Sequence, residues 1–263
     1  MRLTVAGSEV YAYTGTRDFD PSKPVVLFVH GAANDHGVFA LQSRYFAWHG
    51  MNVLAVDLPG HGRSHGEPLE SVEALADWLR AVMDAAGVAE ACVVGHSMGA
   101  LVALEFAARN RERVVRLALL GPAAPMTVAD DLLAAAARND HVAYELINGW
   151  SFSAGQLGGN EVPGMWMVGN TMRLLERNRD GVLSVDLLAC HRYANGLAAA
   201  SAVQCPTLVV IGARDVMAPV RNAKALIAAL SSVRTVTLPE TGHALMAERP
   251  NEVLDALRSF LLT

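Results

Sequence analysis

The sequence lacks the features that would direct it to nucleic acid or to a membrane. Its 21 lysines and arginines are outnumbered by 26 aspartates and glutamates, and no run of basic residues appears. The resulting net charge of −5 argues against nucleic acid and anionic membrane surfaces as partners. No apolar run reaches the roughly 18 residues needed to span a bilayer, and the start of the chain lacks the long apolar stretch of a secretory signal. We therefore expect a cytoplasmic protein with no membrane span.

Cysteine is scarce as well. Cys92, Cys190 and Cys205 are odd in number and widely spaced, which is typical of reduced thiols in a cytoplasmic protein. None of them forms a C-x-x-C pair, so we expect no zinc or other metal site. Internal repeats are also absent. The 263 residues, of which 52% are hydrophobic, are enough for a large buried core.

Apolar, β-branched runs alternate with helical patterns over much of the chain. The predicted strands cover residues 3–6, 10–14, 25–29, 51–56, 92–94, 114–120, 206–212 and 233–238. Strands that alternate with helices build βαβ units, so we predict an α/β fold with a mainly parallel sheet and helices on both faces. Ligands of such sheets bind at the carboxyl ends of the strands.

This alternation is interrupted in the second half of the chain. Residues 122–201 are rich in alanine and show helical patterns over 166–177 and 185–200. We interpret 122–201 as a mostly helical cap inserted between two strands. Residues 1–121 and 202–263 would then form the core domain.

A serine motif follows the strand at 92–94. The run Gly95-His96-Ser97-Met98-Gly99 fits G-x-S-x-G, and a helical pattern begins directly after it. A strand, a tight turn and a helix with serine at the tip form a nucleophile elbow. We expect Ser97 to have strained φ and ψ angles and to hold its Oγ in a pocket. The backbone N–H of Met98 opens the helix and would point to a developing oxyanion.

A catalytic serine needs a base, and the base needs a group that orients it. His243 follows the last predicted strand, in a loop before the final helix, and is the candidate base. Asp215 comes just after the strand at 206–212 and is the candidate orienting carboxylate. Asp57 also ends a strand but precedes the serine, so we expect it to fix its own Pro-Gly loop. The order Ser97, Asp215, His243 is the one expected of an elbow architecture.

The loop after the strand at 25–29 is expected to supply a second oxyanion donor. Gly31 permits an unusual turn there, and the backbone N–H of Ala32 is the candidate donor. We expect the side chains of His30 and His61 to support loops rather than to take part in chemistry.

The cap contributes apolar and aromatic side chains that could cover Ser97. As a group they suggest an apolar roof, and hence an apolar acyl or alcohol part in the substrate. The candidate pocket residues are Trp150, Phe152, Trp166, Met167 and Tyr193.

Together these residues resemble the α/β-hydrolase superfamily, in the group of small capped esterases and lactonases. The resemblance rests on His30-Gly31, Asp57-Leu58-Pro59-Gly60-His61-Gly62-Arg63-Ser64, the motif around Ser97, Gly212 with Asp215 and Pro219, and Gly242-His243. It implies an eight-stranded sheet with an antiparallel second strand, and no cofactor. Haloalkane dehalogenases and epoxide hydrolases carry aspartate where this chain has Ser97. Lipases of the His-Gly-Gly-Gly type are excluded by Ala32 and Ala33.

We therefore predict a serine hydrolase that cleaves a carboxylic ester, lactone or thioester through an acyl-enzyme on Ser97. Two alternatives stay open. One is C–C bond hydrolysis of a β-diketone-like substrate with the same triad, and the other is a slow-turnover ligand receptor on the same fold. The expected partner is a small molecule, and either a monomer or a homodimer is compatible with the sequence.

Overall fold

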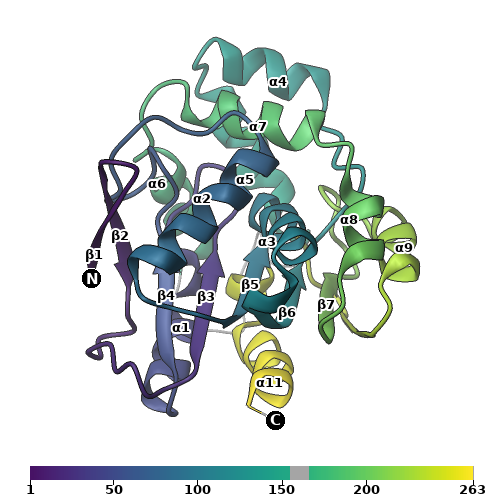
Figure 1. Ribbon diagram of the computed structural model, residues 1–263. Coiled ribbons are helices and arrows are strands. Elements are labelled where there is room, and N and C mark those ends of the chain that lie inside the picture. Colours follow the sequence, from purple (N-terminus) through teal and green to yellow (C-terminus); the bar gives the residue numbers. More distant parts are fainter. Residues whose placement is uncertain (155–165, 263) are drawn as a thin grey trace.

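The computed structural model describes residues 1–154 and 166–262, and an eight-stranded sheet lies at its centre (Figure 1). In sheet order the strands are β1 (Arg2–Val5), β2 (Ser8–Tyr13), β4 (Asn52–Val56), β3 (Val25–Val29), β5 (Ala91–His96), β6 (Val114–Leu120), β7 (Thr207–Gly212) and β8 (Val233–Leu238). β2 is antiparallel to both β1 and β4, and the other neighbouring strands are parallel. The predicted mostly parallel sheet, with its second strand antiparallel, is confirmed.

Helices cover both faces of this sheet, as the alternating sequence pattern predicts. They are α1 (Ala40–Trp48), α2 (Val72–Ala85), α3 (Met98–Arg109), α8 (Gly196–Ala202), α9 (Val220–Ala229), α10 (Leu245–Glu248) and α11 (Pro250–Leu261), with short 3-10 turns η1 (His36–Phe39) and η2 (Arg111–Arg113). Successive side chains of a strand point to opposite faces. Along β3, Leu27 and Val29 pack toward α2 and α3, whereas Val26 and Phe28 pack toward α1 and α11. β3 is therefore buried from end to end.

A separate group of helices lies over one end of the sheet (Figure 1). It contains α4 (Asp130–Ala137), α5 (Val142–Ser151), α6 (Met167–Leu175) and α7 (Val182–Arg192). Their apolar faces form a small core of their own, which includes Leu132, Ile147, Leu175 and Leu187. These helices cover the carboxyl ends of the parallel strands, where the candidate catalytic residues lie.

The single helix expected over residues 185–200 is instead two helices, α7 and α8. The chain turns between them because Tyr193 and Asn195 bind a core carboxylate. The Tyr193 hydroxyl donates to Glu105 Oε2 on α3 at 2.7 Å, and Asn195 Nδ2 donates to the same oxygen at 2.9 Å. α8 then packs on α3 and α9. The division into a core (1–121 and 202–263) and a cap (122–201) stays a prediction.

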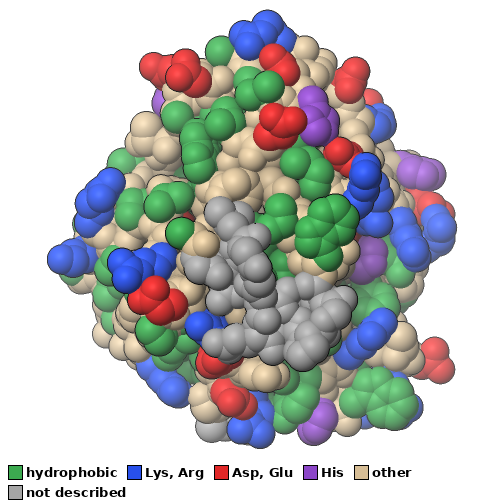
Figure 2. All heavy atoms as spheres, turned by 180° about the vertical axis from the view of Figure 1, so that it is seen from behind, with side chains coloured by type: hydrophobic (Ala, Val, Ile, Leu, Met, Phe, Trp, Pro, Cys, Tyr) green, Lys and Arg blue, Asp and Glu red, His purple; other side chains and the backbone are tan. Residues whose placement is uncertain are grey.

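On the face seen in Figure 2, basic and acidic side chains are interspersed rather than gathered by sign. Within the two described ranges, no helix combines the length and the apolar character needed to cross a membrane.

Two glycines allow β5, α3 and β3 to pass unusually close to one another. A Cβ added to Gly95 would collide with the carbonyl oxygen of Gly99, and one added to Gly99 would collide with that of Val29. Backbone atoms cannot move aside as the end of a flexible side chain can. The elbow therefore needs glycine at both positions, which holds Ser97 over the end of the sheet.

We predict that Gly99→Ala lowers the free energy of unfolding by about 1–3 kcal/mol, because the new methyl group would collide with the backbone of β3 where α3 passes over it. The matched control is Gly149→Ala on the exposed side of α5, where a Cβ meets no atom within 4 Å. That variant should gain roughly 0.5–1 kcal/mol from reduced backbone entropy of the unfolded chain. Urea unfolding followed by circular dichroism measures both, and equal midpoints for the two variants would contradict the crossing constraint.

Candidate active site

Ser97 lies at the tip of the turn between β5 and α3. Its φ of 55° and ψ of −119° fall in a region that residues with a Cβ rarely adopt. The strained backbone is held on both sides, since the Ser97 N–H donates to Leu120 O and the Ala100 N–H donates to Ser97 O, each at 2.9 Å. The turn thus presents a half-buried serine to the cavity above the sheet.

Asp215 and His243 are brought together by the loops after β7 and β8. His243 Nδ1 lies 2.7 Å from Asp215 Oδ2, and both side chains are buried. The other carboxylate oxygen, Oδ1, accepts N–H groups from Met217 at 2.9 Å and Ala218 at 2.8 Å. Because the carboxylate only accepts, Nδ1 carries the hydrogen and Nε2 is left as the basic nitrogen of the neutral ring.

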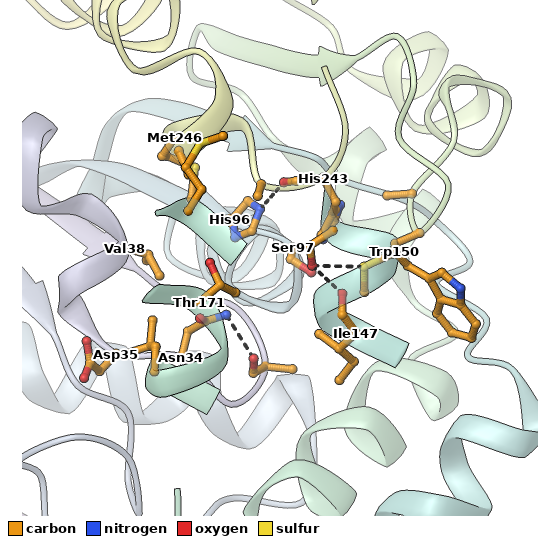
Figure 3. A pocket seen from close by; sticks show the side chains of 18 of the residues that line it. Asn34, Asp35, Val38, His96, Ser97, Ile147, Trp150, Thr171, His243 and Met246 are labelled. Atoms are coloured by element: carbon orange, nitrogen blue, oxygen red, sulfur yellow. Dashed lines mark hydrogen bonds between the residues drawn. The ribbon is translucent and has the colours of Figure 1, made fainter. Parts of the chain in front are cut away.

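His243 and Ser97 line the same cavity (Figure 3). Nε2 of His243 is buried and has no hydrogen-bond partner among the described residues, so the Ser97 hydroxyl is not yet bonded to it. Catalytic hydrogen bonds of this kind are often long without substrate and tighten when it binds. The three residues predicted as a triad therefore lie in one place, with the histidine–aspartate bond already formed.

Burial and charge act in opposite directions on this pair. Burial alone would lower the pKa of His243, but the charge of Asp215 and its hydrogen bond outweigh burial and raise that pKa above its ordinary value of 6.5. Burial alone would raise the pKa of Asp215, but the charge and hydrogen bond of His243 lower it instead. The pair thus favours a charged carboxylate beside an imidazole that accepts a proton readily.

The His243 loop is supported by two buried side chains. His96 Nε2 donates to the carbonyl oxygen of His243 at 2.9 Å, and burial lowers the His96 pKa to about 3, so that ring is neutral. Glu248 Oε1 accepts the Gly242 N–H at 2.8 Å, while Oε2 accepts the Ser153 N–H at 3.0 Å and its hydroxyl at 2.7 Å. The sequence analysis missed Glu248. Its only signal is an acid a few residues after the histidine, which does not reveal the partners.

The loop after β3 has the supports that the sequence predicts. His30 Nδ1 donates to Gly31 O at 2.8 Å, and its Nε2 accepts the Leu58 N–H at 3.0 Å. Ala32 lines the cavity beside Ser97. Met98 is the first residue of α3, so its N–H has no partner within the helix. Two backbone donors are thus available near the serine.

Asp57 supports its own loop, as expected. Its carboxylate accepts backbone N–H groups from His36 and Arg63, each at 2.8 Å. Asp35, His36 and Asp57 bring possible metal-ligand atoms within 4.8 Å of one another. Asp35 already accepts the Gly37 N–H at 2.7 Å and pairs with Arg177. Because protein donors occupy these carboxylates, we assign the group a structural role.

The cavity has a volume of about 620 Å³ and extends from Ser97 under α4, α5 and α6. Most of its walls are apolar, and they include Val38, Met126, Leu132, Ile147, Leu187 and Met246. Of the candidate pocket residues, Trp150 and Met167 line it.

The other three candidate pocket residues point elsewhere. Tyr193 bonds to Glu105 behind the cavity, Phe152 is buried away from the lining, and Trp166 is 72% exposed. These placements correct the prediction for Phe152, Trp166 and Tyr193, because an aromatic residue in a helical cap can face the cap core, the sheet or solvent.

Comparisons with known proteins agree with the observed fold. A sequence model described as "Alpha/beta hydrolase family" matches residues 26–256. A pimeloyl-[acyl-carrier protein] methyl ester esterase from Chromobacterium violaceum is 29% identical over 249 residues, which cover 91% of this chain and 95% of that protein. A putative carbamate hydrolase from Klebsiella pneumoniae is 27% identical over 247 residues, covering 85% and 86% of the two chains. The crystal structure of the enol-lactonase from Burkholderia xenovorans has the same fold, with a TM-score of 0.88 at 22% identity and full coverage of both chains.

We predict that the His243 imidazole titrates above pH 6.5 and that Asp215→Asn lowers its pKa, because the stabilising charge is lost. Since the folded-state pKa is raised, the pair stabilises the fold below pH 6.5, and this contribution is lost as the pH rises through the folded-state value. Histidine NMR titration measures the change. His61, whose pKa is raised by Asp186 instead, is the internal control and should not move. An unchanged His243 pKa in the variant would contradict the assignment.

Proposed function

Because this chain belongs to the alpha/beta hydrolase family, we propose that it is a serine hydrolase that cleaves a carboxylic ester, lactone or thioester. One observation carries the proposal: a strained serine and a hydrogen-bonded His243–Asp215 pair lie at the wall of the same cavity. The names of the relatives, a methyl ester esterase and an enol-lactonase among them, support the same class of bond.

The proposed reaction proceeds through an acyl-enzyme. Ser97 Oγ turns toward His243 Nε2, gives up its proton to it and attacks the substrate carbonyl carbon. The carbonyl oxygen becomes an oxyanion, which accepts hydrogen bonds from the N–H groups of Ala32 and Met98. His243 then passes its proton to the leaving oxygen or sulfur as the carbonyl re-forms. Water, activated by the same imidazole, attacks the acyl-enzyme and releases the acid.

Asp215 acts through the histidine. Its carboxylate holds the Nδ1–H, which keeps Nε2 directed at the cavity and stabilises the imidazolium that forms during the attack. The two N–H groups that Asp215 Oδ1 accepts keep the carboxylate itself in place. An aspartate so fixed limits the imidazole to one tautomer.

The cavity favours a substrate with an apolar portion. Its volume of about 620 Å³ is within the range of small-molecule sites, and its walls are mainly aliphatic and methionine side chains. We therefore propose a small-molecule substrate whose acyl or alcohol part lies against α5 and α6. The cytoplasmic location and the lack of a cofactor stay predictions from the sequence, and so does the choice between monomer and homodimer.

We predict that Ser97→Ala lowers kcat for p-nitrophenyl esters by roughly 10⁴- to 10⁶-fold while the protein stays folded, because the nucleophile is removed. The matched control is Ser201→Ala, an exposed serine on α8 that bonds only to its own helix. The control should keep wild-type turnover and react with a fluorophosphonate probe at Ser97.

Retention of most of the turnover by Ser97→Ala would refute the proposed nucleophile. Stoichiometric labelling of Ser97 without multiple turnover of any ester would instead favour the receptor alternative.

A further inference from the structure

The loop that carries the candidate oxyanion donor has an unusual conformation one residue further on. Ala33 is fully buried and has a φ of 52°, which a residue with a Cβ adopts only where surrounding contacts hold it. The loop has no glycine at this position that would make such a φ easy. What holds Ala33 therefore determines the path of the chain beside Ser97.

Two side chains, one from α7 and one from the segment before it, hold the peptide groups of Ala33. Its N–H donates to Asp186 Oδ2 of α7 at 2.8 Å, and its carbonyl accepts from Asn178 Nδ2, between α6 and α7, at 2.6 Å. Asn178 and Asp186 are 145 and 153 positions away from Ala33 in the chain. The strained residue is thus fixed on both sides by a distant part of the molecule.

Asp186 is itself held in place by a buried ion pair. His61 Nε2 lies 2.8 Å from Asp186 Oδ2, and His61 Nδ1 lies 2.9 Å from Pro59 O. Both partners are acceptors, so both ring nitrogens carry hydrogen and the ring is a cation. His61 and Asp186 are 2% and 1% exposed. A charge pair this deeply buried cannot separate without great loss of stability, so it fixes the carboxylate firmly.

Two carbonyl groups of the same loop are hydrogen-bonded as well. Gly31 O accepts from His30 Nδ1 at 2.8 Å and from the Asn34 N–H at 3.3 Å. Ala32 O accepts from Asn34 Nδ2 at 3.0 Å. By contrast, the Ala32 N–H finds no hydrogen-bond partner in residues 1–154 or 166–262. These contacts therefore constrain the loop on both sides of Ala32 and leave the Ala32 N–H free at the cavity wall.

We propose that Asp186 and Asn178 are positioning residues that hold the Ala32 N–H in the orientation needed to bind the oxyanion. This inference rests on the proposed function. Helix α7 and the segment before it then do more than cover the substrate, because their contacts with Ala33 complete the catalytic centre. Without these contacts Ala33 would relax toward negative φ and its neighbouring peptide planes would rotate, turning the Ala32 N–H away.

The first test is Asn178→Ala, measured with p-nitrophenyl butyrate and with phenylboronic acid, which forms a tetrahedral adduct on an active serine. We expect kcat to fall about 10- to 100-fold with little change in KM, because misplacing a catalytic donor by about 1 Å has an effect of this size. The affinity for the boronic acid should fall in proportion to kcat, since the adduct also uses the oxyanion donors. Asn178 is half-buried, so this variant should fold.

The matched control is Asn195→Ala. It makes the same substitution and removes the same type of Nδ2–H donor, which binds Glu105 on α3 at 2.9 Å, away from the oxyanion loop. The control should keep wild-type kcat and wild-type boronic acid affinity. Asp186→Asn is the second variant and should resemble Asn178→Ala, with its fold checked by circular dichroism.

Three outcomes decide the matter. Unchanged kcat and boronic acid affinity in Asn178→Ala would overturn the inference. Equal losses in Asn178→Ala and Asn195→Ala would overturn it too, because they would indicate general loosening of the helices over the sheet. A wild-type protein that hydrolyses no ester would contradict the proposed function instead, so failures of the two proposals are distinguishable.

Discussion

The sharp reversal of the chain at Ser97 is the constraint on which the rest of the structure depends. β5 enters the turn from the middle of the sheet, and α3 leaves it across the neighbouring strand β3, with backbone almost touching backbone. Such a turn is possible only because side chains are absent at Gly95 and Gly99. Once it forms, Ser97 has a fixed place at the carboxyl end of the sheet. The loops after β3, β7 and β8 end around the same point, so their side chains meet there.

Buried carboxylates fix the loops around this point. Asp215, Glu248 and Asp186 each accept more than one hydrogen bond, and each joins segments that are distant in sequence. A buried carboxylate is stable only when its oxygens are well paired, so the donors around it are held firmly in return. The loops at the site are therefore rigid without disulfides or long stretches of regular structure.

The sequence predicts the sheet well, and it places the three candidate catalytic residues after strands of that sheet, for physical reasons. The inner strands β3, β5 and β7 are continuous apolar runs because helices bury them on both faces, and such runs are easy to recognise in the sequence. Ser97 follows β5 and Asp215 follows β7, whereas His243 follows β8, a mostly exposed strand rich in valine and threonine. Placing the strands in the sequence also places these three residues. The turn at Tyr193–Asn195, by contrast, depends on Glu105, which is about 90 residues away in the chain. No local sequence pattern indicates which carboxylate a tyrosine will bind. Glu248, Asp186 and Asn178 could not be predicted for the same reason, because their partners are also distant in the sequence or unmarked by any local pattern.

The shared carboxylate of Glu248 has a consequence for protein engineering. One of its oxygens holds the segment just after α5, and the other holds the residue before His243. Directed evolution that reshapes the pocket at the end of α5 would therefore disturb the general base as well. Substitutions there that widen the substrate range would therefore also lower turnover. Libraries aimed at α6, which has no such link to Glu248, would separate the two traits more cleanly.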